Sequence, residues 1–192
     1  MEKMETDGDK ETLKGLRQMV QELEHDLFRP KAKYQDAFFF PSKPNVARLC
    51  KYIGMAKKSI DLCIFSFTND DLAGEIIKAH QRGCKVRIIT DDESMKGKGA
   101  DAQRCSDAGI PTRTDDAPDY HMHNKFMVVD STFLVTGSFN WTFQAGSHNQ
   151  ENIVVVDGEF YCSKYNAEFN NLWAQFSKNE LEHAENKAAS LI

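Results

Sequence analysis

The sequence predicts an α/β protein in which a mixed β-sheet carries helices on both faces. Strand-like apolar runs alternate with amphipathic helical segments through the first part of the chain. Two strand-like runs then follow each other directly, at 126–129 and 133–136. Alternating strands and helices favour parallel pairing, whereas consecutive strands favour an antiparallel pair, so both kinds of pairing are expected in one sheet.

An acidic amphipathic helix is expected in the N-terminal segment 1–30. Its apolar residues recur at a spacing of three and four: Leu13, Leu16, Val20, Leu23 and Leu27. Its polar face is rich in acidic side chains, namely Glu11, Glu22, Glu24 and Asp26. Pro30 ends the helix, because the residue before a proline avoids helical geometry.

The main domain is expected over 31–176, followed by a polar tail over 177–192. Strands are expected at 37–40, 59–67, 84–90, 110–113, 126–129, 133–136 and 153–156. Helices are expected at 44–57, 70–80, 100–108 and 159–176. Pro44 opens the first of these, Asn69 or Asp70 caps the second, and Gly83 stops it.

Composition limits the class of protein. A chain of 192 residues can bury one sizeable core. No apolar stretch approaches the length of a bilayer span, so no transmembrane segment is expected, and the acidic N-terminus does not resemble a signal sequence. The five cysteines form no C-x-x-C pair, which predicts reduced thiols of an intracellular protein and no structural zinc.

The most informative pattern is H-x-K-x4-D-x6-G-S-x-N, formed by His123, Lys125, Asp130, Ser138 and Asn140. A phosphodiester is anionic and slow to hydrolyse, so an enzyme must neutralise its oxygens and supply a nucleophile. A histidine can be that nucleophile, a lysine supplies a fixed positive charge, and serine and asparagine donate hydrogen bonds. His123 and Lys125 are two residues apart beside a strand, which places them on the same side.

This pattern resembles the signature of the phospholipase D superfamily. The sequence 137–142 and the Phe39–Ser42 stretch are similar to the single-motif subfamily that includes mitochondrial cardiolipin hydrolase, the Zucchini endonuclease and bacterial Nuc. The resemblance implies a phospholipase D-like fold and metal-independent phosphodiester hydrolysis through a phosphohistidine, with no cofactor. It also implies a catalytic set of His123, Lys125, Asp130 and Glu151, with Ser138 and Asn140 binding the phosphate. In that set Glu151 hydrogen-bonds the nucleophilic histidine. The animal members carry a zinc module after the Phe-Phe-Pro-Ser stretch, and only Lys43–Val46 fills that gap here.

One copy of the motif implies two chains. Cleavage through a phosphohistidine needs a second group that protonates the leaving oxygen, and larger family members carry two motifs in one chain. We therefore expect a homodimer in which His123 of each chain serves one shared site. His121, on the same side as His123, is the local alternative, although a position in the substrate groove is the favoured interpretation.

The substrate stays open between classes. Single-stranded nucleic acid, RNA or DNA, is favoured for two reasons. The acidic N-terminal helix would be repelled by an anionic membrane. Basic residues near Phe38–Phe40 suit a phosphate backbone, namely Lys31, Lys33, Lys43, Arg48 and Lys51. The alternatives are a phospholipid such as cardiolipin at a membrane surface and an inactive binding or scaffold protein. A cytoplasmic location is expected, with peripheral attachment to the mitochondrial surface as the alternative.

Three consecutive acids follow the strand expected at 84–90, at the edge where open α/β sheets place ligands: Asp91, Asp92 and Glu93. Acids at this place could indicate a metal site. A negative cluster repels phosphate, however, so the favoured interpretation is a loop that positions the cations of Lys96 and Lys98.

Overall fold

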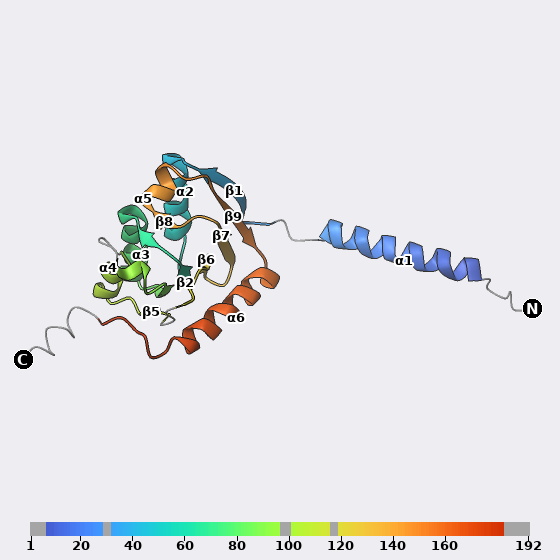
Figure 1. Cartoon of the computed structure of the whole chain (residues 1–192). Helices are drawn as coiled ribbons and strands as arrows, with labels where there is room; N and C mark the ends of the chain where they lie inside the picture. The colour runs from blue at the N-terminus through green and yellow to red at the C-terminus, as the bar shows by residue number, and fades with distance from the viewer. Residues whose placement is uncertain (1–6, 29–31, 97–100, 116–118, 183–192) are drawn as a thin grey trace, which may run out of the picture. The chain divides into compact units, whose positions relative to one another are not determined.

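The computed structural model describes residues 7–28, 32–96, 101–115 and 119–182, and the chain divides into two compact units, Met1–Lys33 and Tyr34–Ile192. The first unit contains helix α1, Asp7–Phe28 (Figure 1). Four residues of the expected apolar stripe, Leu13, Leu16, Val20 and Leu23, are exposed on it. None of the helices in the described ranges is long and apolar enough to cross a membrane.

A mixed sheet forms the centre of the second unit. Within the described residues it has seven strands in the order β1-β9-β7-β6-β2-β4-β5. The strands are β1 Gln35–Phe40, β2 Ser59–Ile64, β4 Lys85–Thr90, β5 Thr112–Thr114, β6 Lys125–Val129, β7 Phe133–Gly137 and β9 Glu151–Asp157. Strands β2, β4 and β5 pair in parallel, whereas β1, β9, β7, β6 and β2 pair antiparallel in succession. The predicted mixed sheet is therefore confirmed.

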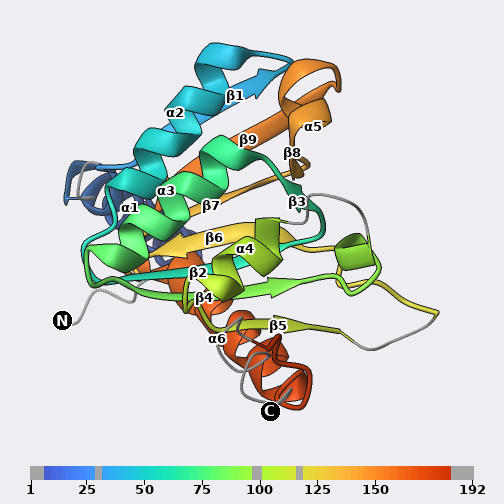
Figure 2. The ribbon, with the colours of Figure 1, turned by 90° about the vertical axis from the view of Figure 1, so that its left-hand side faces the viewer.

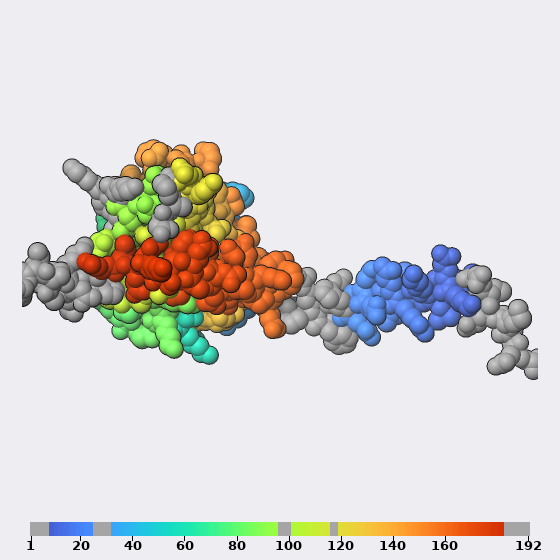
Figure 3. Space-filling view, turned by 60° about the horizontal axis from the view of Figure 1, so that its bottom comes forward, coloured from blue at the N-terminus to red at the C-terminus, as the bar shows by residue number. Residues whose placement is uncertain are grey.

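Helices cover both faces of this sheet (Figure 2). One face packs against α2 Lys43–Gly54, α3 Asp70–Gln81 and α4 Asp101–Asp107, and their apolar side chains build the larger core. The other face packs against α6 Glu159–Gln175, which lies across the molecule in Figure 3. Buried strand residues therefore alternate between two cores, as expected for a sheet between helix layers.

Smaller elements surround the carboxyl end of β2. Strand β3, Phe67–Thr68, pairs in parallel with β8, Trp141–Thr142. Helix α5, Phe143–Ser147, follows β8 directly, and the 3₁₀ turn η1, Ser94–Lys96, follows β4.

Capping residues explain where the helices begin. The Ser42 side chain accepts from the Asn45 N–H at the start of α2, and the Asn69 side chain accepts from the Leu72 N–H at the start of α3. The Asn69 cap agrees with the sequence prediction. Helix α2 ends at Gly54, earlier than the predicted 57.

The predicted polar tail begins later than Ser177. The Leu181 N–H donates to the Thr112 carbonyl and the Thr114 N–H to the Asn179 carbonyl, so this segment lines the free edge of β5. Arg113 also pairs with Glu180 at 3.1 Å. Covering an edge strand in this way satisfies its backbone groups, and 183–192 lie outside the described residues.

Candidate active site

His123 and Lys125 lie together at the start of β6. Met122, directly before this pair, is buried and donates its N–H to Asp115 Oδ2 at 2.8 Å, whereas His123 is exposed. Lys125 Nζ donates to the His123 carbonyl at 2.9 Å and lies 3.3 Å and 3.4 Å from the two ring nitrogens. The structure thus places a cation beside the candidate nucleophile, as the spacing predicted.

The Phe65 ring lies close to both His123 and Lys125. Strand β2 ends at Ile64, before the predicted 67, and Phe65 follows it directly. Its ring centroid lies 4.6 Å from that of His123 and 5.3 Å from Lys125 Nζ. An aromatic face favours a nearby cation and restricts the imidazole rotamer.

Ser138 joins the same cleft from the end of β7. A cleft of about 350 Å³ is lined by His123, Asn124, Lys125, Phe126, Thr136, Gly137, Ser138 and Tyr165. The Ser138 hydroxyl donates to Glu151 Oε2 and accepts from the Asn152 N–H at 3.1 Å. The candidate nucleophile His123, the cation of Lys125 and the hydrogen-bonded hydroxyl of Ser138 therefore line one cleft that is open to solvent.

Glu151 has different partners from those the resemblance implied. Its carboxylate accepts from Ser138 and from the Asn149 side-chain amide at 3.2 Å, and among the described residues it makes no hydrogen bond to His123. Glu151 instead acts electrostatically on Lys125, because its charge partly opposes the burial that lowers the pKa of that lysine. Glu151 therefore holds the Ser138 side chain by a hydrogen bond and offsets part of the lowering of the Lys125 pKa.

Asn140 stays outside the cleft lining. Its amide oxygen is buried and has no hydrogen-bond partner among the described residues. The carbonyl of Asn140 accepts from the Thr142 N–H at 2.9 Å, which helps to form the turn into α5. Its predicted phosphate contact remains a prediction.

Asp130 lies at the far end of β6, away from the cleft. Its carboxylate accepts from three consecutive backbone N–H groups, of Lys57 at 2.9 Å, Lys58 at 2.7 Å and Ser59 at 2.8 Å. Five residues of extended strand separate it from Lys125, about 16 Å along the chain. The carboxylate therefore ties the β6–β7 turn to the start of β2, and the catalytic role predicted for Asp130 stays a prediction.

Replacing Asp130 with alanine is therefore expected to reduce stability rather than chemistry. Removal of an ionised acceptor leaves three N–H groups without their partner, and we expect a loss of about 2–3 kcal/mol in the free energy of unfolding. Urea denaturation measures this loss, and kcat per folded molecule should stay near wild type. Asp130→Asn is the matched control, because asparagine keeps one acceptor oxygen and tolerates the positive φ of 54° at this position. A large fall in kcat in a fully folded Asp130→Asn variant would restore the catalytic role.

The surroundings of His123 favour the neutral form of its ring. Partial burial, the nearby Lys125 charge and His121 together lower the pKa of His123, against a smaller opposing effect of Asp91. Burial likewise lowers the pKa of Lys125. A neutral imidazole is the form that can attack phosphorus, so the environment favours the nucleophilic state.

This arrangement predicts a specific titration shift. In wild type the His123 ring should titrate below the ordinary histidine range, and Lys125→Met should move its pKa upward, because the methionine removes a repelling positive charge without removing the side chain. NMR titration of the His123 ring protons measures both values. An unchanged pKa in Lys125→Met would show that the lysine does not act on the histidine.

Of the three acids after β4, Asp91 is a hydrogen-bond acceptor in the structure. Fully buried Asp91 accepts from the Ser94 N–H at 3.1 Å and contacts His121 Nδ1 at 3.0 Å, and Asp115 Oδ1 accepts from the Asp92 N–H at 3.0 Å. One carboxylate oxygen each of Asp91, Asp92 and Asp115 lie within 4.8 Å of one another. The side chain of Lys96 and all of Lys98, which these acids were expected to position, lie outside the described residues. The sequence interpretation missed the contact with His121.

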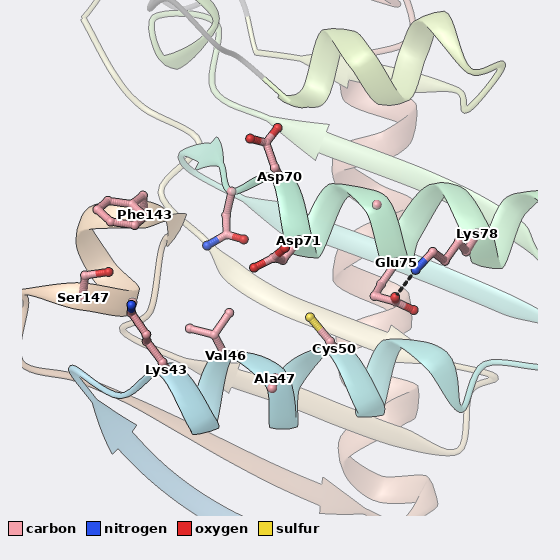
Figure 4. A pocket seen from close by; sticks show the side chains of 13 residues that line it. Lys43, Val46, Ala47, Cys50, Asp70, Asp71, Glu75, Lys78, Phe143 and Ser147 are labelled. Atoms are coloured by element: carbon pink, nitrogen blue, oxygen red, sulfur yellow. Dashed lines mark hydrogen bonds and ion pairs between the residues drawn. The ribbon is translucent and has the colours of Figure 1, made fainter.

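A larger pocket lies elsewhere and holds none of the motif residues. It encloses about 570 Å³ between α2, α3 and α5 (Figure 4). Lys43, Asp70, Asp71 and Glu75 contribute its charges, and Glu75 pairs with Lys78 at 2.7 Å. Of the basic residues expected to hold a nucleic-acid backbone, Lys43 lines this pocket and Arg48 is paired with Asp36 at 2.7 Å.

Comparison with known proteins decides the family. Residues 49–173 match the family model described as cardiolipin synthase, PLD-like domain. The chain belongs to the phospholipase D superfamily. That assignment confirms the resemblance predicted from the histidine, lysine and serine motif.

Several phospholipase D relatives cover most of the second unit. The chain is 35% identical to mitochondrial cardiolipin hydrolase of Chlamydomonas reinhardtii over 75% of its length, and 39% identical to that of Homo sapiens over 69%. These matches span 64% and 52% of the two relatives. Among solved structures, the fold is similar to that of Nuc, a phospholipase D family member from Salmonella typhimurium, with a TM-score of 0.70 and 28% identity over 76% of this chain and 96% of Nuc.

Proposed function

We propose that this protein is a metal-independent phosphodiesterase that uses His123 as a covalent nucleophile and cleaves single-stranded nucleic acid. The observation that carries the proposal is the common cleft of His123, Lys125 and Ser138. Its supports are the lowered pKa of His123, which favours the neutral ring, and membership of the phospholipase D superfamily.

The reaction proceeds in two displacements. A ring nitrogen of His123 attacks phosphorus, and the bond to the leaving oxygen breaks with its electron pair going to that oxygen, which takes a proton from an acid. Lys125 and the Ser138 hydroxyl stabilise the charge that develops on the non-bridging oxygens. Water then attacks the phosphohistidine, losing its proton to the same group that acted as acid, and releases the histidine.

A second copy of the chain supplies the acid in this proposal. Within the described cleft, Lys125 and Ser138 are held by other contacts and His123 is the nucleophile. Two clefts related by a two-fold axis would bring the partner's His123 to the opposite side of the phosphorus, where the leaving oxygen departs.

Mixing wild-type and His123→Ala chains tests this shared site. If both copies of His123 are needed, activity follows the square of the wild-type fraction, so an equal mixture retains about one quarter of the wild-type activity. Independent sites would leave about half. Co-expression with two affinity tags, followed by assays at several ratios, separates the two curves. A linear dependence would contradict the shared site.

Nucleic acid is the substrate that the cleft suits best. Most of its lining is polar and would face a sugar-phosphate backbone, whereas a lipid would also need an apolar trough for acyl chains. The phospholipid alternative has its own support, because the relatives that cover this unit are named mitochondrial cardiolipin hydrolases. A nuclease of this kind fits a cytoplasmic location, and a cardiolipin hydrolase fits the mitochondrial surface.

A substrate panel in the presence of EDTA tests the function. The 192-residue chain is assayed on single-stranded RNA, single-stranded DNA and cardiolipin vesicles. We expect nucleic-acid cleavage that survives the chelator and weakens as salt rises, because binding releases counterions. Cleavage of vesicles alone would replace the proposed substrate by lipid. Loss of activity in EDTA with recovery in Mg²⁺ would instead assign a catalytic ion to the acids around Asp91.

A further inference from the structure

A second histidine stands beside the proposed nucleophile in a fixed orientation. The Asp91 side chain is fully buried at the carboxyl end of β4, and its Oδ2 lies 3.0 Å from His121 Nδ1. The other Asp91 oxygen accepts from the Ser94 N–H at 3.1 Å. A buried carboxylate held in this way fixes both the position and the tautomer of the imidazole.

The rest of the His121 ring is available to a ligand. The His121 side chain is 46% exposed, whereas its partner Asp91 is fully buried. Because Asp91 engages Nδ1, Nε2 is the ring nitrogen left for a ligand, to which an imidazolium would donate its second N–H. Such an N–H can form a charge-assisted hydrogen bond to an anion.

His121 and His123 share one support and one side of the chain. Both rings contact Phe65, with centroids at 5.6 Å and 4.6 Å, and buried Met122 separates them. Two residues of extended chain span about 6.6 Å. The sugar-phosphate repeat of a single strand puts neighbouring phosphates at a comparable separation. His121 does not line the cleft around His123, so it is placed for the next phosphate rather than the scissile one.

We propose that His121, oriented by Asp91, binds the phosphate adjacent to the scissile one on a single-stranded nucleic acid. The inference rests on the proposed function and adds a substrate requirement to it. A strand with a flanking phosphate gains a contact that a substrate with a single phosphodiester does not. The charged groups near His121 are Asp91, Asp92, Asp115, His123 and Lys125, and Asp91 is its hydrogen-bonded partner.

The test compares substrates with one and with several phosphodiesters. The 192-residue wild-type chain and its His121→Ala variant are assayed on bis-p-nitrophenyl phosphate, a dinucleotide and a hexanucleotide. We expect His121→Ala to lose about tenfold in kcat/KM on the hexanucleotide, through KM, and to match wild type on the other two substrates. His121→Lys keeps a cationic donor and should recover much of the loss. His148→Ala, which removes an exposed histidine after α5, is the matched control and should change none of the three.

Asp91→Asn tests the orienting contact. If the carboxylate acts through His121, Asp91→Asn raises KM on the hexanucleotide, and adding it to His121→Ala has no further effect. Activity on bis-p-nitrophenyl phosphate verifies that each variant is folded.

Three results would overturn the inference. Equal losses on all three substrates would make His121 catalytic or structural. No loss on any substrate would remove its role. If the wild-type protein cleaves bis-p-nitrophenyl phosphate but neither the dinucleotide nor the hexanucleotide, the nucleic-acid function itself is refuted. This outcome differs from a failure of the His121 inference alone.

Discussion

Replacement of His123 with alanine is expected to abolish phosphodiester cleavage, lowering kcat by at least about 10⁴-fold. The histidine is the only proposed nucleophile, and in a shared site its loss removes the general acid as well. The side chain is exposed, and the contacts of its ring with described residues are those with Lys125 and the Phe65 ring, so the fold should remain intact. Turnover of bis-p-nitrophenyl phosphate and a thermal melt measure the two effects.

The loss of activity in Lys125→Ala is the comparison for the loss in His123→Ala. Removing one electrostatic stabiliser of the transition state costs about 10²–10³-fold, so this variant should keep measurable activity when His123→Ala has none. Residual activity above about 1% in a folded His123→Ala variant would show that another group attacks phosphorus.

Replacement of Gly137 with alanine is expected to have the largest effect on stability. An added Cβ would lie 2.1 Å from the Asn152 carbonyl oxygen and 2.9 Å from its carbon, both part of the β9 backbone. That same carbonyl accepts the Ser138 N–H at 3.1 Å. The two strands must separate to admit the methyl group, which we expect to cost at least about 3 kcal/mol and to displace Ser138. Urea denaturation and kcat report the two consequences.

Gly158→Ala is the matched control for this clash. Gly158 has a φ of 117° and no heavy atom within 4 Å of an added Cβ, so alanine there suffers backbone strain alone. We expect a cost of about 1–2 kcal/mol and normal kcat. Equal destabilisation by the two substitutions would mean that β7 and β9 can move apart without penalty.

The sheet could be predicted because its strands carry strong local signals. The runs around Phe126 and Phe133 are apolar, and a short turn between them leaves only antiparallel pairing. The pairing of the chain after Ser177 with the edge of β5 could not be predicted in the same way. The chain after Ser177 is polar, and its pairing with β5 depends on a free edge that exists only once the sheet has formed.

The site was predicted in part for a similar reason. His123 and Lys125 are neighbours in sequence, and strand geometry alone puts them on one side. The motif also includes Asp130, whose partners at 57–59 lie some seventy residues earlier, so its tethering role appears only in three dimensions. The Asp91–His121 contact likewise joins two strand ends. The sequence signal for this contact was Asp91 directly after β4, together with His121 two residues before His123.

The stereochemistry at phosphorus tests the covalent role of His123 most directly. A chiral phosphorothioate diester is cleaved in ¹⁸O-labelled water, and the configuration of the product is determined. Each in-line displacement inverts phosphorus, so attack by His123 followed by attack by water predicts overall retention. Overall inversion would mean that water attacks the diester directly, and it would contradict the phosphohistidine intermediate.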